Sequence, residues 1–297
     1  MPERMIGVIG GTGLGQALSS TTGGEEIHID TPFGPPSSPI TLTEWEGQKV
    51  AILPRHGSGH VLNPTEVPFR ANIYALKKLG VTHIIASGAT GSLREEIQPR
   101  DLVIADQVID KTYKRDGTFF DSGLAAHVEF AQPFCGVLRR ALLACAEQVE
   151  TQVHDGGVYV CMEGPQFSTV AESRMHRVWG GDVIGMTCMP EAKLAREAEI
   201  CYALVALPTD YDCWRPHDPG KDQGALLEEI VHNLEIATQH AIQLIQRTIA
   251  HLANQADTDC TCSSALKLAI FSDKDKLEHA KLAHLKLLLE KYIAFGD

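Results

Sequence analysis

Two carboxylates stand directly after a long uncharged run in the second half of the chain. The run covers residues 202–208, and Asp210 and Asp212 follow it. An uncharged, mostly apolar run of this length is typical of a strand buried on both faces of a parallel sheet. Because ligands of open α/β sheets bind at the carboxyl ends of the strands, these acids are placed to serve as a proton donor and its helper. The competing interpretation is that they are ordinary loop and cap residues.

Small residues and one arginine follow three other apolar runs. They are the glycine-rich residues 10–15, Arg55 and the small residues 87–92. Glycines let backbone N–H groups approach an anion closely, and a guanidinium binds phosphate through parallel hydrogen bonds. If the runs are neighbouring strands, all three segments reach one rim of the sheet. The sequence therefore predicts a phosphate-binding rim.

A dinucleotide-binding fingerprint is the main alternative for the glycine-rich segment. The fingerprint needs Gly or Ala where this chain has Gln16, although Asp30 could stand for the ribose-binding acid. A nucleotide-binding module of the NAD type is therefore disfavoured. His56 and His60 have the i, i+4 spacing of a metal site, but two glycines between them disfavour a helix, so we expect no metal in the functional site.

Composition narrows the class of protein. The chain has 297 residues, 44% hydrophobic and 22% charged, which is ordinary for a globular protein with a substantial core. The formal net charge of -12 argues against nucleic acid as a partner. The amino terminus has no signal-peptide pattern, and no run of apolar residues is long enough to span a membrane. We expect a cytoplasmic protein with no membrane partner.

The cysteines leave one question open. Eight cysteines without a CxxC pair do not suggest a disulfide scaffold or a zinc finger. Cys260 and Cys262 form a CxC pair, which is a candidate redox clip or weak metal site. Two incidental thiols are the other interpretation.

Alternating patterns predict an α/β fold. Periodic apolar residues predict helices at 63–79, 136–149, 169–179, 190–198 and 225–252. Apolar runs predict strands at 5–9, 49–54, 82–86, 101–108, 157–162, 182–184 and 202–208. Strands alternating with helices indicate a single α/β domain, here assigned to residues 1–252. Residues 253–297 are predicted to form a polar linker and a helical C-terminal tail.

Several short motifs, taken in order, carry a family resemblance. They are GGTG (10–13), TPFGPP (31–36), PRHG (54–57), ANIYAL (71–76), GSLREEIQP (91–99), PFC (133–135), EGP (163–165), FS (167–168), GMT (185–187) and TDYDCW (209–214). Together they resemble the methylthioadenosine phosphorylase branch of the purine nucleoside phosphorylases, over roughly residues 5–250. The resemblance implies a mixed central sheet flanked by helices. It also implies a homo-oligomer, a trimer or a dimer of trimers, in which a neighbouring subunit touches each active site.

The same resemblance implies a reaction. Such enzymes cleave S-methyl-5'-thioadenosine with inorganic phosphate, giving adenine and 5-methylthio-D-ribose 1-phosphate, in purine and methionine salvage. Phosphate is a co-substrate, and no cofactor is expected. The alternative is a phosphorylase of 6-oxopurine nucleosides or methylthioinosine, which would prefer Asn or an apolar residue where this chain has Asp210. A non-catalytic relative is disfavoured because Arg55, Thr187, Asp210 and Asp212 are all present.

The resemblance also assigns roles to individual residues. Phosphate binding falls to Thr12, Arg55, His56, Ala89, Thr90 and Thr187. Substrate binding falls to His127, Phe167, Ser168, Met186, Asp210, Asp212 and Leu226, or Leu227 in place of Leu226. Asp210 would donate a proton to purine N7, which requires burial or a neighbouring Asp212 to keep its carboxyl protonated. Asp210 or Asp212 would also accept from the exocyclic amine of adenine.

Four departures from the family pattern are Thr90, Gln166, Gly185 and Pro208, and none removes a named role. Gly185 is typical of microbial members. The CxC pair is similar to one near the end of some archaeal members, where it accompanies disulfides and hexamers. By that resemblance Cys260 could pair with Cys262, and Cys135 with Cys201.

Overall fold

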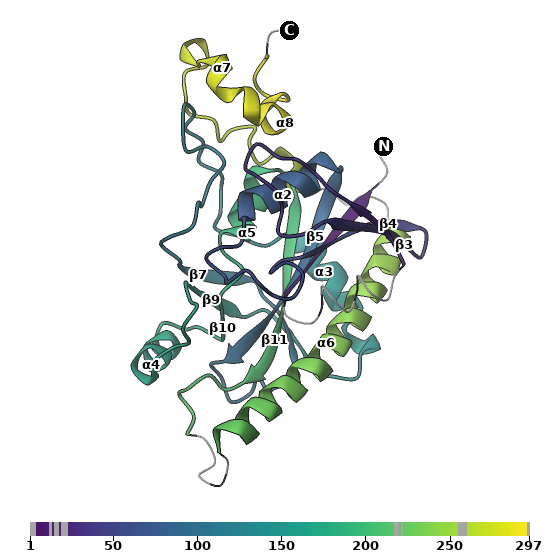
Figure 1. Cartoon of the computed structure of the whole chain (residues 1–297), viewed down its shortest axis with the longest axis vertical. Coiled ribbons are helices and arrows are strands. Elements are labelled where there is room, and N and C mark those ends of the chain that lie inside the picture. The colour runs from purple at the N-terminus through teal and green to yellow at the C-terminus, as the bar shows by residue number, and fades with distance from the viewer. Residues whose placement is uncertain are drawn as a thin grey trace.

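A computed structural model shows how four parallel strands form the centre of the protein (Figure 1). It describes residues 4–11, 14, 18, 23–216, 220, 222–254 and 260–295. Strands β1 (Met5–Gly10), β4 (Gln48–Pro54), β5 (Val81–Ser92) and β11 (Cys201–Asp210) run in one direction, in the order β4-β1-β5-β11. Their carboxyl ends therefore meet at one rim, as the sequence predicts.

The remaining strands make the sheet mixed. They are β2 (Glu25–Ile27), β3 (Ile40–Trp45), β6 (Leu102–Ile104), β7 (Gln107–Lys111), β8 (Val153–Asp155), β9 (Val158–Met162) and β10 (Val183–Gly185). Over the described part of the chain the strands form one eleven-stranded sheet. Strand β10 pairs antiparallel with the end of β5, whereas β6 pairs antiparallel with β11. The expected α/β fold with a mixed sheet is confirmed.

The central strands are buried on both faces, which explains their uncharged sequences. Along β11, Ala203, Val205 and Leu207 join one apolar cluster, and the alternate residues Tyr202 and Leu204 join the other. Side chains of a strand point alternately to the two faces of a sheet, so a two-sided core needs apolar residues at every position.

Helices cover both faces of the sheet. On one face lie α2 (Phe69–Lys78) and α5 (Glu191–Glu197); on the other lie α3 (Gly136–Ala144) and α6 (Gln223–Ala253), which runs along the side of the sheet (Figure 1). Helix α4 (Val170–Val178) stands at the end formed by β9 and β10. Thr169 and Glu172 form a capping box that fixes the start of α4.

Four predicted elements differ from the structure. The helix predicted at 136–149 ends at Ala144, and a separate 3-10 turn, η1 (Ala146–Gln148), follows it. The helix predicted at 63–79 begins only at Phe69, because Pro64 and Pro68 interrupt the segment before it. The small residues 87–92 continue β5 instead of forming a loop, since β11 and β10 pair with them. The strand predicted at 101–108 is two strands, because β6 pairs with β11 and β8 whereas β7 pairs with β9.

The C-terminal segment packs against the main body of the protein. Its helical turns are η2 (Thr261–Ser264), η3 (Lys274–Lys276), α7 (His279–Leu282), η4 (Ala283–Leu285) and α8 (Lys286–Leu289). Leu266, Leu282 and Leu289 are buried in the same cluster as α2 and α5. The division of the chain at residue 252 into a domain and a C-terminal tail remains a prediction.

Within the described residues, no helix is both long and apolar enough to cross a membrane.

Candidate active site

The second half of β5 forms the floor of the candidate site. On one side β11 runs parallel to it, with Leu207 beside Ala89 and Asp210 beside Gly91. On the other side β10 pairs antiparallel with residues 91 and 92, and the chain continues past it toward Gly88. The segments after β10 and at the end of β11 thus lie on opposite flanks of one strand.

Arg55 follows β4 and is fully buried. Its Nε and Nη2 donate to the two carboxylate oxygens of Glu191 at 2.7 and 2.9 Å, and its Nη1 donates to the carbonyl of Ser87 at 2.8 Å. Burial acts to lower the pKa of Arg55, but the charge of Glu191 overcomes this effect and the pKa is raised. Of the five N–H bonds of the Arg55 guanidinium, these contacts use three, so one on Nη1 and one on Nη2 can donate to a ligand.

Two hydrogen-bond donors lie close to Gly88. The position that a Cβ on Gly88 would take lies 3.1 Å from Thr187 Oγ1 and 4.0 Å from Arg55 Nη1. Gly11, after β1, approaches from a third direction, since its own Cβ position is 3.2 Å from the same Nη1. A hydroxyl, a guanidinium edge and glycine backbone grouped in this way are suited to a small anion, and we call the region between them the anion space.

His56 follows Arg55 directly in the sequence, and its ring is neutral. Burial, and after it the charge of Arg55, lowers the pKa of His56 to about 4. Its Nδ1 is 2.9 Å from the carbonyl oxygen of Leu62, which can only accept, so Nδ1 carries the proton. Nε2 is then an acceptor at neutral pH.

Asp210 and Asp212 meet at Gly91. The two oxygens of Asp210 accept from the hydroxyl of Thr209 and from the backbone N–H of Asp212, both at 2.7 Å. A Cβ on Gly91 would lie 3.0 Å from Asp212 Cβ and 3.3 Å from Asp210 Oδ1. Asp212 has a φ of 50°, in the left-handed region, which turns the chain back toward Asp210. The two donors fix the orientation of the Asp210 carboxyl group.

Thr90 lies between the anion space and the aspartates. Its carbonyl oxygen lies 3.3 Å from Thr209 Oγ1, whereas its buried hydroxyl, like that of Ser87, has no hydrogen-bond partner within the described residues. Ala89 is half-buried in the same strand. Backbone and hydroxyl groups of β5 therefore line the floor from Ser87 to Gly91.

Met186 is held against the loop 163–165. Arg115 donates to the carbonyls of Met186 and Glu163, each at 2.6 Å, and its Nε lies 3.2 Å from Glu163 Oε1. Two backbone N–H groups, at Tyr113 and Lys114, also donate to Glu163. This buried clamp joins two motifs that lie more than twenty residues apart in the sequence.

Gly185 is a glycine for a packing reason. A Cβ there would be 2.0 Å from the hydroxyl of Tyr159, which in turn accepts from the N–H of Thr187 at 3.4 Å. The phenol therefore occupies the space that a side chain at 185 would need, and it supports Thr187.

Phe167 and Ser168 stand at the open side. The ring of Phe167 is 82% exposed, which leaves a face free for stacking. Ser168 is half-buried, and its carbonyl accepts from the thiol of Cys213 at 3.2 Å. Cys213 follows Asp212 directly, so the Phe167 loop lies next to the aspartates.

Other predicted residues are not joined to this group. His127 is exposed; its N–H donates to Ala269 and its ring packs against Phe271 at 5.2 Å, so its described contacts are with the C-terminal segment. Leu226 is half-buried and Leu227 is 62% exposed on the first turns of α6. Thr12 lies outside the described residues.

Several supporting residues were missed at the level of sequence. Glu191 lies within the helix predicted at 190–198 and has no predicted role, and Tyr202, which donates to Glu191 at 2.8 Å, is predicted only as part of a buried strand. Arg115 and Tyr159 had no assigned role. An acid at the first position of α5 and a tyrosine in an otherwise aliphatic strand were the available signals.

Residues 5–250 match the model of the phosphorylase superfamily, and the chain belongs to that family. The family resemblance predicted from the sequence motifs is confirmed.

Relatives make the comparison more specific. The chain is 48% identical to S-methyl-5'-thioadenosine phosphorylase of Gloeobacter violaceus, over 99% of this chain and 98% of the relative. It is 44% identical to the protein of the same name from Hyperthermus butylicus, over 89% and 95% of the two chains. A crystal structure of a methylthioadenosine phosphorylase from an antarctic soil metagenomic library superposes with a TM-score of 0.88 at 42% identity, covering 97% of this chain and 100% of that one. The Schistosoma mansoni methylthioadenosine phosphorylase in complex with adenine gives 0.80 at 33% identity, over 89% and 96% of the two chains.

Proposed function

We propose that the protein cleaves S-methyl-5'-thioadenosine with inorganic phosphate, forming adenine and 5-methylthio-D-ribose 1-phosphate. A phosphate oxygen forms a bond to C1' of the ribose while the bond from C1' to N9 breaks. The electron pair of that bond moves into the purine, and Asp210 supplies the proton that N7 takes up. The products would enter purine and methionine salvage.

One observation carries the proposal: the anion space and the aspartates lie three residues apart along β5. Gly88 borders Thr187 and Arg55, and Gly91 borders Asp210 and Asp212. Three residues of a strand span about 10 Å, which leaves room for a ribose between a phosphate and a purine. Names of the relatives and the adenine bound to the Schistosoma mansoni structure support the same assignment.

The phosphate would be bound by Thr187, Arg55, His56 and the backbone near Ala89, with Thr12 and Thr90 as further contacts. Glu191 neutralises Arg55, so the anion is held by directed hydrogen bonds more than by net charge. The bare Nε2 of His56 suits the P–OH group of hydrogen phosphate. These groups need no cofactor.

The base would stack on Phe167, with Ser168 beside it and Met186 against the ribose hydroxyls. A carboxylate accepts from the amine of adenine, whereas O6 of hypoxanthine would be a second acceptor facing it. We therefore expect the enzyme to prefer 6-aminopurine nucleosides.

A homo-oligomer, trimeric or a dimer of trimers, would complete the methylthio end of the site. His127 has contacts only with its own C-terminal segment among the described residues, so in this scheme it would act in a neighbouring copy, opposite Leu226. Large exposed apolar side chains support an interface: Tyr113, Phe167, Val178, Leu268 and Phe271. The mass of the native particle, measured by light scattering, tests this part; a monomer at working concentration would contradict it.

A cytoplasmic location is supported by eight unpaired cysteines.

The reaction is tested by measuring purine release from methylthioadenosine, adenosine and inosine, each with and without phosphate. The expected result is adenine release from methylthioadenosine that depends on phosphate, together with a sugar 1-phosphate product. Release without phosphate would indicate a hydrolase, and preference for inosine would favour the 6-oxopurine alternative.

A further inference from the structure

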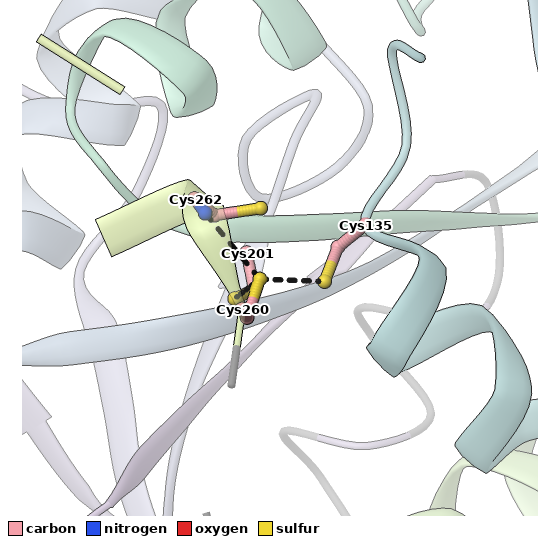
Figure 2. A group of neighbouring side chains, drawn as sticks. All are labelled: Cys135, Cys201, Cys260 and Cys262. Atoms are coloured by element: carbon pink, nitrogen blue, oxygen red, sulfur yellow. Dashed lines mark hydrogen bonds between the residues drawn. The ribbon is translucent and has the colours of Figure 1, made fainter. Parts of the chain in front are cut away.

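Four cysteine side chains gather at one point far from the rim of the sheet. Cys201 begins β11, at the end opposite Asp210, and Cys135 precedes α3. Cys260 and Cys262 come from the C-terminal segment. Their sulfur atoms all lie within 4.8 Å of one another. Figure 2 shows the four side chains gathered at this point.

The spacing of the sulfurs fits a tetrahedron. Cys260 Sγ is 3.4 Å from Cys135 Sγ and 3.5 Å from Cys201 Sγ, so it has two near partners instead of one (Figure 2). Zinc bound by four thiolates at about 2.3 Å places the sulfurs about 3.8 Å apart. The two short distances differ from this value by about 0.3–0.4 Å, and no other pair of sulfurs is more than about 1 Å longer than it.

The surroundings suit thiolate ligands. Cys135, Cys201 and Cys262 are each at most 5% exposed within an apolar cluster, where water competes little for a metal. Two sulfurs accept backbone hydrogen bonds, Cys135 from Leu138 at 3.5 Å and Cys260 from Cys262 at 3.4 Å. The first of these places Cys135 at the positive amino-terminal end of α3. Hydrogen bonds to ligand sulfurs are part of a functioning metal site.

We propose that these four cysteines bind one zinc ion as a structural tetrathiolate site. An all-sulfur, closed donor set selects a soft tetrahedral cation and excludes magnesium or calcium. On binding, Zn²⁺ takes the place of the thiol protons, which are released to solvent. The ion would join the start of β11 and the start of α3 to the C-terminal segment.

Two other chemistries are open to the same thiols. Oxidation could form two disulfides, with each pair giving two electrons and two protons to a cellular oxidant. Alternatively, the thiols could stay free. Both outcomes differ from zinc binding in metal content and in mass.

The test begins with the full-length protein purified without chelators from cells grown with zinc. Elemental analysis should give about one zinc per chain. In Cys262→Ser the affinity for zinc should fall by at least about tenfold. Cys145→Ser is the matched control, because Cys145 is also buried in this cluster but lies outside the four-sulfur group. That variant should keep its zinc.

A second measurement uses the unchanged chain. Replacement of the metal by Co²⁺ should give the sulfur-to-cobalt charge-transfer bands and the strong visible bands of a tetrahedral thiolate site. Metal-free protein with every thiol open to alkylation would overturn the proposal. So would metal-free protein whose intact mass shows the four cysteines joined in disulfides.

Discussion

Arg55 and Glu191 form a fully buried pair in which two guanidinium nitrogens contact the two carboxylate oxygens, at 2.7 and 2.9 Å. The pair joins the residue after β4 to the first residue of α5. Because both side chains are at 0% exposure, neither charge is solvated by water, and each depends on the other. The position of the Arg55 fork at the anion space is therefore set by an acid from the helix layer.

Replacing Glu191 by Gln should destabilise the protein strongly. The change leaves the guanidinium buried without a counter-charge, and loss of one partner from a buried pair costs about 3–5 kcal/mol. Tyr202→Phe removes only the hydroxyl that donates to Glu191 and should cost about 1 kcal/mol. Urea unfolding of both variants measures the two free energies. If both variants lose the same small amount of unfolding free energy, Arg55 does not depend on the charge of Glu191.

Adding a methyl group at Gly88 should impair phosphate binding. The new Cβ would stand 3.1 Å from Thr187 Oγ1, inside the space assigned to the anion. A displacement of reacting groups by about 1 Å can cost on the order of 10²-fold, so we expect a loss of this size in kcat/KM for phosphate. Gly117→Ala is the control, because its Cβ would meet only the end of the Lys193 side chain, at 4.0 Å. Unchanged phosphate kinetics in Gly88→Ala would place the anion elsewhere.

Asp210→Asn should slow the release of adenine. An amide keeps the shape of the carboxyl group and can still accept from the N–H of Asp212, but it cannot donate a proton to N7. General acid catalysis is typically worth on the order of 10²–10⁴ in rate, and the loss should fall in kcat. The activity of the variant on inosine should fall less, because O6 of inosine no longer faces a carboxylate at position 210. If methylthioadenosine turns over at the original rate, Asp210 is not the proton donor.

Glu197 should make stability depend on pH. Burial raises its pKa from 4.5 to about 7, although Phe119 N–H and the hydroxyl of Thr118 both contact the carboxyl group. Because the folded pKa is the higher one, the folded state holds a proton between pH 4.5 and 7 that the unfolded chain has released. The contribution of Glu197 to stability therefore falls as pH rises through this window, by up to about 3 kcal/mol.

Glu197→Gln removes that proton equilibrium, and its amide can donate to Thr118. The difference between the free energies of unfolding of the variant and the wild type should shift in favour of the variant from pH 5 to pH 8. Exposed Glu147 offers a control, because Glu147→Gln should give a difference that stays constant. A constant difference for Glu197→Gln as well would mean that the carboxyl group ionises in the fold without cost.

Several features of this protein follow from local sequence. Apolar runs predicted β1, β4, β9 and β11, because a strand segment covered on both faces must be apolar at every covered position. The helix predicted at 169–179 agrees with α4 to within one residue at each end, because the capping box of Thr169 and Glu172 is made by neighbouring residues. The paired Asp210 and Asp212 were recognised in the same way.

Other features were decided only by contacts between distant segments. Residues 87–92 look like a loop, since small residues have low strand propensity, and they form a strand because β10 and β11 supply hydrogen bonds on both sides. Glu191 could not be assigned to Arg55 from sequence, because 136 residues separate them. The same is true of Cys135 and Cys260, which are 125 residues apart and meet because α3 and the C-terminal segment pack at the start of β11. The sequence therefore determined which chemical groups the protein has. The packing of the layers decided which of these groups are in contact, because a polar or charged group that the fold buries is stable only beside a partner.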